Sequence, residues 1–180
     1  LALSFVALTT WAQQPQLTWL GLTSSSDRFT VAYDISADGK VVVGYANRGG
    51  TYGSDSYGFI WTRERGFQMI STNRTDRPMS LIYCISADGL TVGGAFWKFD
   101  GWPISAQWTL HSGPQVVPYF GGNDSYIFDT SADGSVLVGA STGINHGWRA
   151  LRWTRQSPGQ SQNLGTLGGN ESWAYGVSAD

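Results

Sequence analysis

Hydrophobic residues in this chain occur in short runs that are separated by turn-forming residues. Val41–Val43 and Val136–Val138 are apolar at consecutive positions, which indicates β-strands that are covered on both faces. Before each run an aromatic and an apolar residue stand two apart, as Tyr33 and Ile35 do, and this alternation is typical of a strand. After a polar, Gly-rich stretch, a Trp-Thr pair and a last short apolar piece follow. The pattern therefore predicts groups of four short strands, with no helix beyond about residue 20.

These groups repeat along the chain. The tripeptide Ser-Ala-Asp occurs four times, with its aspartates at positions 38, 88, 133 and 180. A period of 45–50 residues fits one blade of a β-propeller, and strands that are apolar on both faces suit a sheet packed between two neighbours. We predict an all-β, propeller-like array of four-stranded antiparallel blades that is partial, with about three blades and the start of a fourth. The expected segments are a lead-in strand at 13–28, repeats at 29–76, 77–121 and 122–169, and the start of the fourth repeat at 170–180.

Each Ser-Ala-Asp leads into a predicted tight turn. The glycine that follows supplies a positive φ without a steric clash, and the aspartate can accept hydrogen bonds from nearby backbone N–H groups. The candidate structural turn residues are Asp38, Gly39, Asp88, Gly89, Asp133 and Gly134. The apolar runs after these turns also end in glycine, at Gly44, Gly93 and Gly139. These repeated residues are predicted to have architectural functions.

The composition argues against a disordered protein and against a nucleic-acid-binding protein. Only 13% of the residues are charged, while 24 are Gly and 25 are aromatic (9 Trp, 8 Tyr and 8 Phe), which suits many short strands and argues against disorder. The net charge is −2 and the 11 Lys and Arg residues are scattered, so we expect no nucleic-acid partner. Cys84 is the single cysteine, so we expect a free or buried thiol and no intramolecular disulfide. No cofactor is expected.

The N-terminal residues resemble part of a secretory signal. Leu1–Leu8 is a short apolar run, and the small residues Thr10 and Ala12 stand at positions −3 and −1 of a predicted cleavage site. The run is too short to span a bilayer. We expect 1–12 to be a signal-peptide remnant and the protein to be secreted, extracellular or on the cell surface; an ordinary apolar strand is the alternative. Asp180 stands one residue before the expected turn glycine, so we expect a piece of a longer array.

The third repeat carries a family resemblance. The segment 174–180 (Ala-Tyr-Gly-Val-Ser-Ala-Asp), preceded by Leu-Gly-Thr-Leu-Gly-Gly at 164–169, resembles the HAF-type extracellular repeat of bacterial proteins. Ser135–Gly139 and Arg149–Thr154 continue that pattern, and the resemblance covers about 17–180, although the first two repeats lack the Leu-Gly-Thr-Leu-Gly-Gly segment. The resemblance implies a secreted or surface-exposed propeller-like array, often in autotransporter-type or surface-anchored proteins, and it brings no catalytic residues with it.

The residues favour a non-catalytic protein. Sialidase-like propellers carry turns of the form Ser-x-Asp-x-Gly-x-Thr-Trp, but here Gly directly follows Asp and the Trp stands 20–23 residues later. A glycosidase also needs paired carboxylates that break the repeat. The non-repeating acids lie mostly in predicted loops: Asp27, Asp55, Glu64, Asp76, Asp100, Asp124 and Glu171. We therefore expect no enzyme and no catalytic residue, with part of a propeller-type carbohydrate-active hydrolase as the alternative. Whether the loops around Asp55 and Asp124 bind calcium stays open.

Aromatic residues in the variable stretches suggest a binding function. Rings on loops suit stacking on sugar rings or on flat partner surfaces. The candidate binding residues are Tyr52, Tyr57, Trp97, Trp102 and Trp148. We expect a scaffold or an adhesive or binding module whose partner is an unknown surface or a carbohydrate ligand. The alternative is that these aromatics cover blade edges.

Overall fold

The computed structural model describes residues 17–49, 55–70, 72, 79–98, 101–109, 112–144 and 146–180, and within them the fold is all-β without a helix. The strands form three four-stranded antiparallel sheets, each connected in sequence order. The first sheet contains β1 (Phe29–Ile35), β2 (Val41–Asn47), β3 (Ser56–Thr62) and β4 (Gly66–Met69). The second contains β5 (Ser80–Ile85), β6 (Thr91–Trp97), β7 (Pro103–Thr109) and β8 (Gln115–Val116). The third contains β9 (Gly121–Thr130), β10 (Val136–Gly143), β11 (His146–Thr154) and β12 (Gln162–Asn163).

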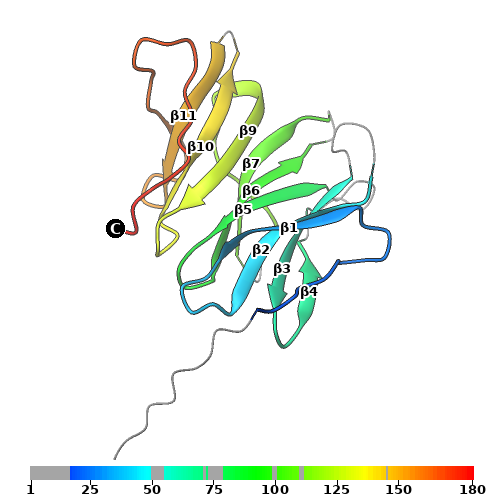
Figure 1. Ribbon diagram of the computed structural model, residues 1–180. Helices are drawn as coiled ribbons and strands as arrows, with labels where there is room; N and C mark the ends of the chain where they lie inside the picture. The colour runs from blue at the N-terminus through cyan, green and yellow to red at the C-terminus, as the bar shows by residue number, and fades with distance from the viewer. Residues whose placement is uncertain are drawn as a thin grey trace, which may run out of the picture.

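The three sheets follow one another as blades (Figure 1), from β1–β4 at the lower right to β9–β11 at the upper left. Strands β1, β5 and β9, the first of each blade, contact their neighbours in succession, and we call them the inner strands. The C-terminal segment 172–179 follows β9 in the same manner, although it belongs to no sheet. The predicted array of four-stranded antiparallel blades is confirmed.

Hydrophobic cores lie between the blades. Between the first and second blades, Val43 and Ile82 are fully buried together with Trp108. Between the second and third blades, Ile127 and Leu137 are fully buried in a second cluster. The consecutive apolar positions predicted this arrangement, because a strand between two neighbouring sheets has no solvated face.

The Ser-Ala-Asp turns have the same geometry in all three complete repeats. In the first, the Ser36 hydroxyl donates to Asp38 Oδ1 (2.7 Å) and accepts from the Val41 backbone N–H (3.0 Å). Asp38 Oδ1 also accepts from the Lys40 backbone N–H (3.0 Å). The same contacts recur around Asp88 and Asp133. Gly39, Gly89 and Gly134 have φ angles of 70°, 74° and 66°, the left-handed values that the predicted turn requires.

These turns make the stability of the fold depend on pH. The Ser36 hydroxyl and the Lys40 N–H lower the pKa of Asp38 from 3.8 to about 2. The Ser135 N–H and the Ser131 hydroxyl lower the pKa of Asp133 to about 2 as well. Because the folded pKa values are depressed, the ionised carboxylates stabilise the fold above pH 3.8, and this contribution is lost as the pH falls towards 2.

The test is urea denaturation between pH 7 and pH 2. We expect the midpoint of the wild-type protein to fall more steeply below about pH 4 than that of the double variant Asp38→Asn, Asp133→Asn. Parallel curves for the two proteins would show that these turns carry no pH-dependent stability.

Backbone hydrogen bonds and a repeated serine join each blade to the next. The turn alanines form a ladder in which Ala37 N–H donates to Ala87 O (3.0 Å), Ala87 N–H to Ala132 O (2.9 Å) and Ala132 N–H to Ala179 O (3.1 Å). A hydroxyl six residues before each turn serine accepts from the third strand of the preceding blade, and we call these residues the joint serines. The pairs are Ser80 with Gly58 N–H (2.9 Å), Ser125 with Ser105 N–H (2.7 Å) and Ser172 with Ala150 N–H (2.9 Å).

The predicted lead-in strand is not formed over the part of 13–28 that the structure describes. Residues 17–28 contain bends and turns but no strand, and Leu17 and Trp19 are almost fully exposed. A strand needs a partner for its backbone hydrogen bonds, and no described strand pairs with this segment. The predicted signal-peptide remnant at 1–12 lies outside the described residues. No helix in the described ranges is long and apolar enough to cross a membrane.

Candidate functional site

Each inner strand carries an aromatic residue at a β-bulge. Tyr33, Tyr83 and Phe128 are the residues skipped by the strand pairing, so two residues of the inner strand oppose one of the next strand. A bulge bends the strand and changes the direction of the side chain at that point. The local sequence thereby places one ring per repeat on the same side of the array.

Glycine opposite the bulge makes this geometry possible. A Cβ atom at Gly44, Gly94 or Gly139 would overlap the carbonyl oxygen of Val31, Leu81 or Tyr126, respectively. The sequence pattern assigned the equivalent position in the second repeat to Gly93, and the strand register corrects this assignment to Gly94. Gly93 lies instead against Cys84 and Ile127 in the core between blades.

The bulge aromatics form a continuous row from blade to blade. Ring centroids are 5.1 Å apart for Tyr33 and Tyr83, 5.6 Å for Tyr83 and Phe128, and 5.1 Å for Phe128 and Tyr175. Tyr45 of β2 stacks on Tyr33 at 5.5 Å. Aromatic pairs at these separations attract one another in edge-to-face and offset geometries, so the rings hold a defined arrangement.

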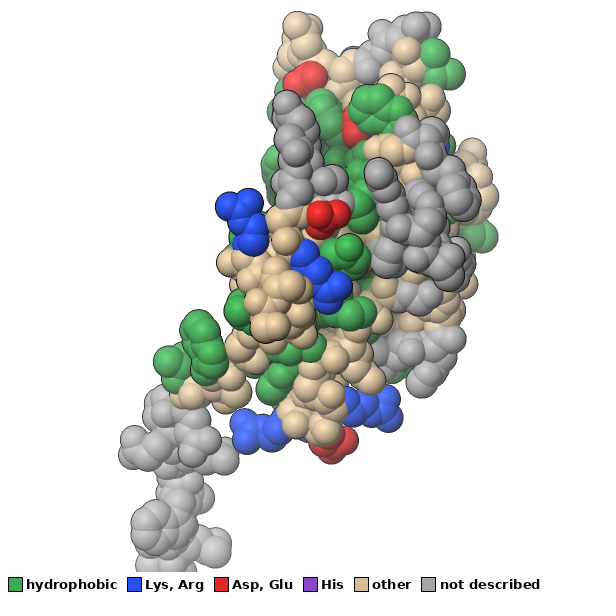
Figure 2. Space-filling model, turned by 90° about the vertical axis from the view of Figure 1, so that its right-hand side faces the viewer, with side chains coloured by type: hydrophobic (Ala, Val, Ile, Leu, Met, Phe, Trp, Pro, Cys, Tyr) green, Lys and Arg blue, Asp and Glu red, His purple; other side chains and the backbone are tan. Residues whose placement is uncertain are grey.

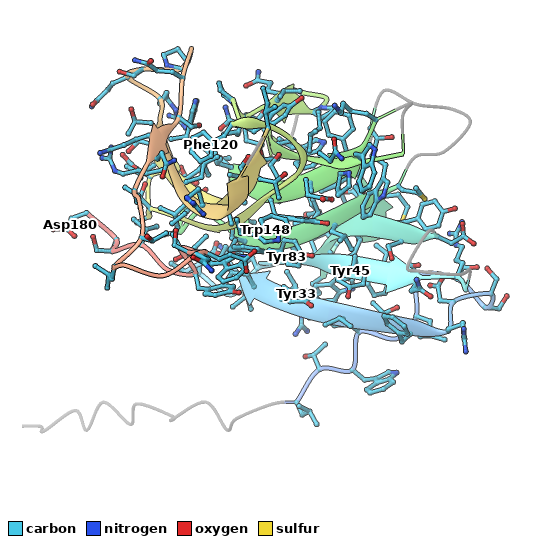
Figure 3. The ribbon with its side chains drawn as sticks, turned by 90° about the horizontal axis from the view of Figure 1, so that it is seen from above. Tyr33, Tyr45, Tyr83, Phe120, Trp148 and Asp180 are labelled. Carbon is cyan, nitrogen blue, oxygen red and sulfur yellow. The ribbon has the colours of Figure 1, made fainter. Side chains whose placement is uncertain are left out.

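A branch of the row crosses the third blade towards the C-terminal segment. Tyr126 lies 6.1 Å from Phe128 and 5.9 Å from Trp148, and Trp148 lies 6.4 Å from Trp173. Figure 3 shows Tyr33, Tyr45, Tyr83 and Trp148 following one another across the three blades. We call the whole set the inner aromatic row; it consists of Tyr33, Tyr45, Tyr83, Tyr126, Phe128, Trp148, Trp173 and Tyr175.

The row is half-buried in its middle and more accessible at its ends. Tyr33 is 47% exposed, Trp173 39% and Tyr175 70%, whereas Tyr83 is half-buried. Burial raises the pKa of Tyr45 to about 12, and hydrogen bonding of its neutral hydroxyl to Tyr33 adds to the effect. Burial also raises the pKa of Tyr126 to about 12, with Asp124 adding to it. The phenols are therefore neutral at physiological pH and offer hydroxyls for hydrogen bonding beside their apolar rings.

Two carboxylates beside the row, those of Asp34 and Asp129, hold neighbouring blades together. Asp34 Oδ1 accepts from its neighbour Ile35 N–H, and its Oδ2 accepts from Ile85 N–H of the second blade, both at 2.8 Å. Asp129 repeats this bridge with Thr130 N–H and Val177 N–H, both at 2.8 Å. The equivalent residue of the second blade is Cys84.

Cys84 lies at the bridging position between these two aspartates. It is 1% exposed, as expected for a buried thiol, and burial followed by the charges of Asp129 and Asp34 raises its pKa. A thiol that stays protonated is a poor nucleophile and a poor metal ligand.

The predicted binding aromatics are not gathered in one place. Trp148 belongs to the inner aromatic row. Tyr57 is half-buried in β3 with the Arg48 guanidinium 4.7 Å from its ring centroid, Trp97 is half-buried at the end of β6, and Trp102 is 44% exposed before β7. Tyr52 lies outside the described residues. The row was missed as a binding surface because four of its members occupy one repeated position, three before the turn serine, which the sequence explains as part of a strand: Tyr33, Tyr83, Phe128 and Tyr175. Tyr45, Tyr126 and Trp173 have no aromatic equivalent in every repeat, so no sequence pattern marks them.

Charges are dispersed around the molecule. On the face seen in Figure 2, a few Lys and Arg side chains and a few Asp and Glu side chains are scattered among exposed hydrophobic groups. Within the described ranges, no group of three or more His, Cys, Asp or Glu side chains is placed to hold a metal ion. Within the described ranges, the candidate site is therefore the row of aromatic side chains and not a cluster of charged groups.

The fold and the inner row define the class of protein as a β-propeller-like array. A solved structure with the same architecture is the crystal structure of TolB from Acinetobacter baumannii, a β-propeller, with a TM-score of 0.56 and 15% sequence identity. The match covers 82% of this chain and 34% of the TolB chain, so this chain spans about a third of that protein's length. No protein-family model matches the sequence, and no curated protein matches it either.

Proposed function

We propose that this chain is a non-catalytic, secreted or surface-exposed bacterial repeat protein that binds a carbohydrate on the inner aromatic row. The observation that carries the proposal is the unbroken contact of aromatic rings across the three blades, with Tyr33, Trp173 and Tyr175 exposed at its ends. Flat rings with hydroxyls at their edges suit the apolar faces and hydroxyl groups of sugar rings.

The carboxylates support a binding function rather than hydrolysis. A glycosidase needs two carboxyl groups that face the substrate across the scissile bond. In this chain Asp34 and Asp129 use their oxygens on backbone N–H groups of neighbouring blades. Asp38 and Asp133 use theirs within the turns. Such engaged carboxylates are poor candidates for a general acid or a nucleophile.

The resemblance to HAF-type repeats and the signal-like residues 1–12 support secretion or surface exposure. A rigid array of blades whose inner strands are joined by hydrogen bonds is a suitable scaffold for a binding surface, because its rings are held in place before the ligand arrives. The same resemblance suggests a surface-anchored or autotransporter-type setting.

Binding should be measured by isothermal titration calorimetry with linear oligosaccharides, using cellohexaose and chitohexaose as the first probes. We expect Trp148→Ala to weaken binding at least fivefold, because truncation of a contacting tryptophan commonly costs about 1 kcal/mol or more. Trp102→Ala is the matched control, since Trp102 is exposed but lies outside the row, and it should bind as the wild type does.

Circular dichroism would verify that both variants keep the wild-type fold. Equal binding by Trp148→Ala and wild type would contradict the assignment of the row, and absence of binding to every linear glycan tested would contradict the carbohydrate proposal.

A further inference from the structure

A groove lies between the second and third blades, each of which has four strands. Its volume is about 550 Å³, which falls within the roughly 300–1,000 Å³ of small-molecule sites. The turns after β5 and β9 line it, together with β7, β8 and the loop after β11. Among the described residues, no member of the inner aromatic row belongs to this lining. The groove is therefore separate from the row.

The third blade contributes a fixed wall with a guanidinium. Trp153 is 4% exposed, and its Nε1 donates to Pro158 O (3.2 Å), which holds the loop after β11 in place. Arg155 Nη2 donates to Gly134 O (3.1 Å) and, across the joint, to Thr91 Oγ1 of the second blade (3.4 Å). A guanidinium has five N–H donors, and those on Nε and Nη1 of Arg155 have no partner among the described residues. They remain for a ligand in the groove.

The second blade contributes a pair of amides. Gln107 Nε2 of β7 donates to Gln115 Oε1 of β8 (3.2 Å). This contact leaves the Gln107 oxygen as an acceptor and the Gln115 nitrogen as a donor. In the first blade the equivalent strand pair places Ile60 opposite Gln68, so the amide pair is absent there. The groove beside the second blade thus has polar groups that the first blade lacks.

A carboxylate oxygen at the groove is also left open. Asp88 Oδ1 accepts from the Ser86 hydroxyl (2.5 Å) and the Leu90 N–H (2.9 Å), whereas its Oδ2 has no partner in the part of the chain that the structure describes. In the first turn the Lys40 ammonium lies 3.0 Å from Asp38 Oδ2. Leu90 replaces this lysine in the second turn, so the chain itself shows how the open oxygen would be occupied by a cation.

These groups suit a neutral ligand with several hydroxyls. An anion would be repelled by Asp88 and Asp133, and a cation by Arg155, but a hydroxyl donates to a carboxylate and accepts from a guanidinium. We propose that the groove between the second and third blades binds one neutral sugar residue, with one hydroxyl donating to Asp88 Oδ2 and a neighbouring hydroxyl accepting from Arg155. The inference goes beyond the proposed function, because it requires no contact with the inner aromatic row.

Titration of the full chain followed by ¹⁵N–¹H correlation NMR tests the proposal. The probes are the methyl glycosides of glucose, galactose and mannose. We expect at least one of them to shift the backbone amides of Leu90, Gln107 and Arg155. Its Kd should be on the order of 1 mM, because a ligand of this size makes only a few contacts.

Two variants copy the first blade into the second. Leu90→Lys supplies an ammonium for Asp88 Oδ2 and should weaken binding at least tenfold; Leu90 is 52% exposed, so the fold tolerates the longer side chain. Gln107→Ile removes the amide pair and should weaken binding about fivefold. Ile144→Lys is the matched control, because it adds the same charge at a residue that is 77% exposed and outside the groove, and it should bind as the wild type does.

The dispersion of the same spectra shows whether each variant is folded. Equal affinity of Leu90→Lys and wild type, or no shift with any of the three glycosides, would overturn the proposal. Shifts confined to the amides of the inner aromatic row would overturn it as well, while they would support carbohydrate binding on the row. Shifts at the groove that Leu90→Lys abolishes would support the groove site even if linear oligosaccharides failed to bind the row.

Discussion

Replacement of Gly94 by alanine is expected to destabilise the protein by about 3 kcal/mol or more, the upper part of the range for overpacked positions. The new Cβ would overlap the carbonyl oxygen of Leu81, a backbone atom that is fixed by the bulge at Tyr83. Neither strand can move away without breaking the pairing that forms the inner edge of the second blade. Urea denaturation followed by circular dichroism at neutral pH would measure the loss as a lower midpoint.

Gly159→Ala provides the matched control. A Cβ at Gly159 meets no atom within 4 Å, so the same chemical change should alter the free energy of unfolding by no more than about 0.5 kcal/mol. If Gly94→Ala were as stable as Gly159→Ala, the bulge would be able to relax, and glycine would not be required opposite the aromatic residue. The same comparison applies to Gly44 and Gly139, which face the same clash in the other blades.

The sequence pattern predicted the blades because the features that form them are local and repeated. The turn around Asp38 and Gly39 needs only hydrogen bonds within six residues, and its glycine is visible in each of the three complete copies. The runs at Val41–Val43 and Val136–Val138 show burial on both faces without reference to any partner strand. A period near 47 residues then fixes how many strands fit between successive turns.

The contacts between blades were not predictable in the same way. Serines such as Ser80 and Ser125 look like ordinary polar residues in a strand, and their function depends on a backbone N–H about 20 residues earlier in the chain. A comparison of the repeats at six residues before each turn would have found the hydroxyl. Its partner becomes evident only when the preceding sheet is in place.

The inner aromatic row could also be predicted only in part from the sequence. Tyr33 belongs to an aromatic position that the sequence repeats, but its contact with Tyr83 requires the bulges to turn both side chains the same way. Trp148 was predicted as a binding residue from its variable surroundings, and its neighbours Tyr126 and Trp173 come from different parts of the chain. The expected lead-in strand, in contrast, was predicted from the sequence but is not formed. An apolar segment forms a strand only where a partner strand lies beside it and completes its backbone hydrogen bonds.

Replacement of Ser125 by alanine is expected to cost about 2 kcal/mol of folding free energy. Ser125 is fully buried, and its Oγ accepts from the Ser105 backbone N–H at 2.7 Å across the joint between the second and third blades. The alanine variant leaves that N–H without an acceptor in a site that water does not reach. The folded state therefore carries the whole desolvation cost of the N–H group. Urea denaturation should show a lower midpoint with an unchanged slope.

Ser157→Ala separates this effect from the general cost of losing a serine. The Ser157 side chain is exposed in the turn after β11, so its replacement should change the free energy of unfolding by less than about 0.5 kcal/mol. Equal stability of the two variants would mean that the joint serine makes no net contribution and that the blades are held by their apolar cores alone. A large loss for Ser125→Ala would instead show that one hydroxyl in each repeat stabilises the contact between neighbouring blades.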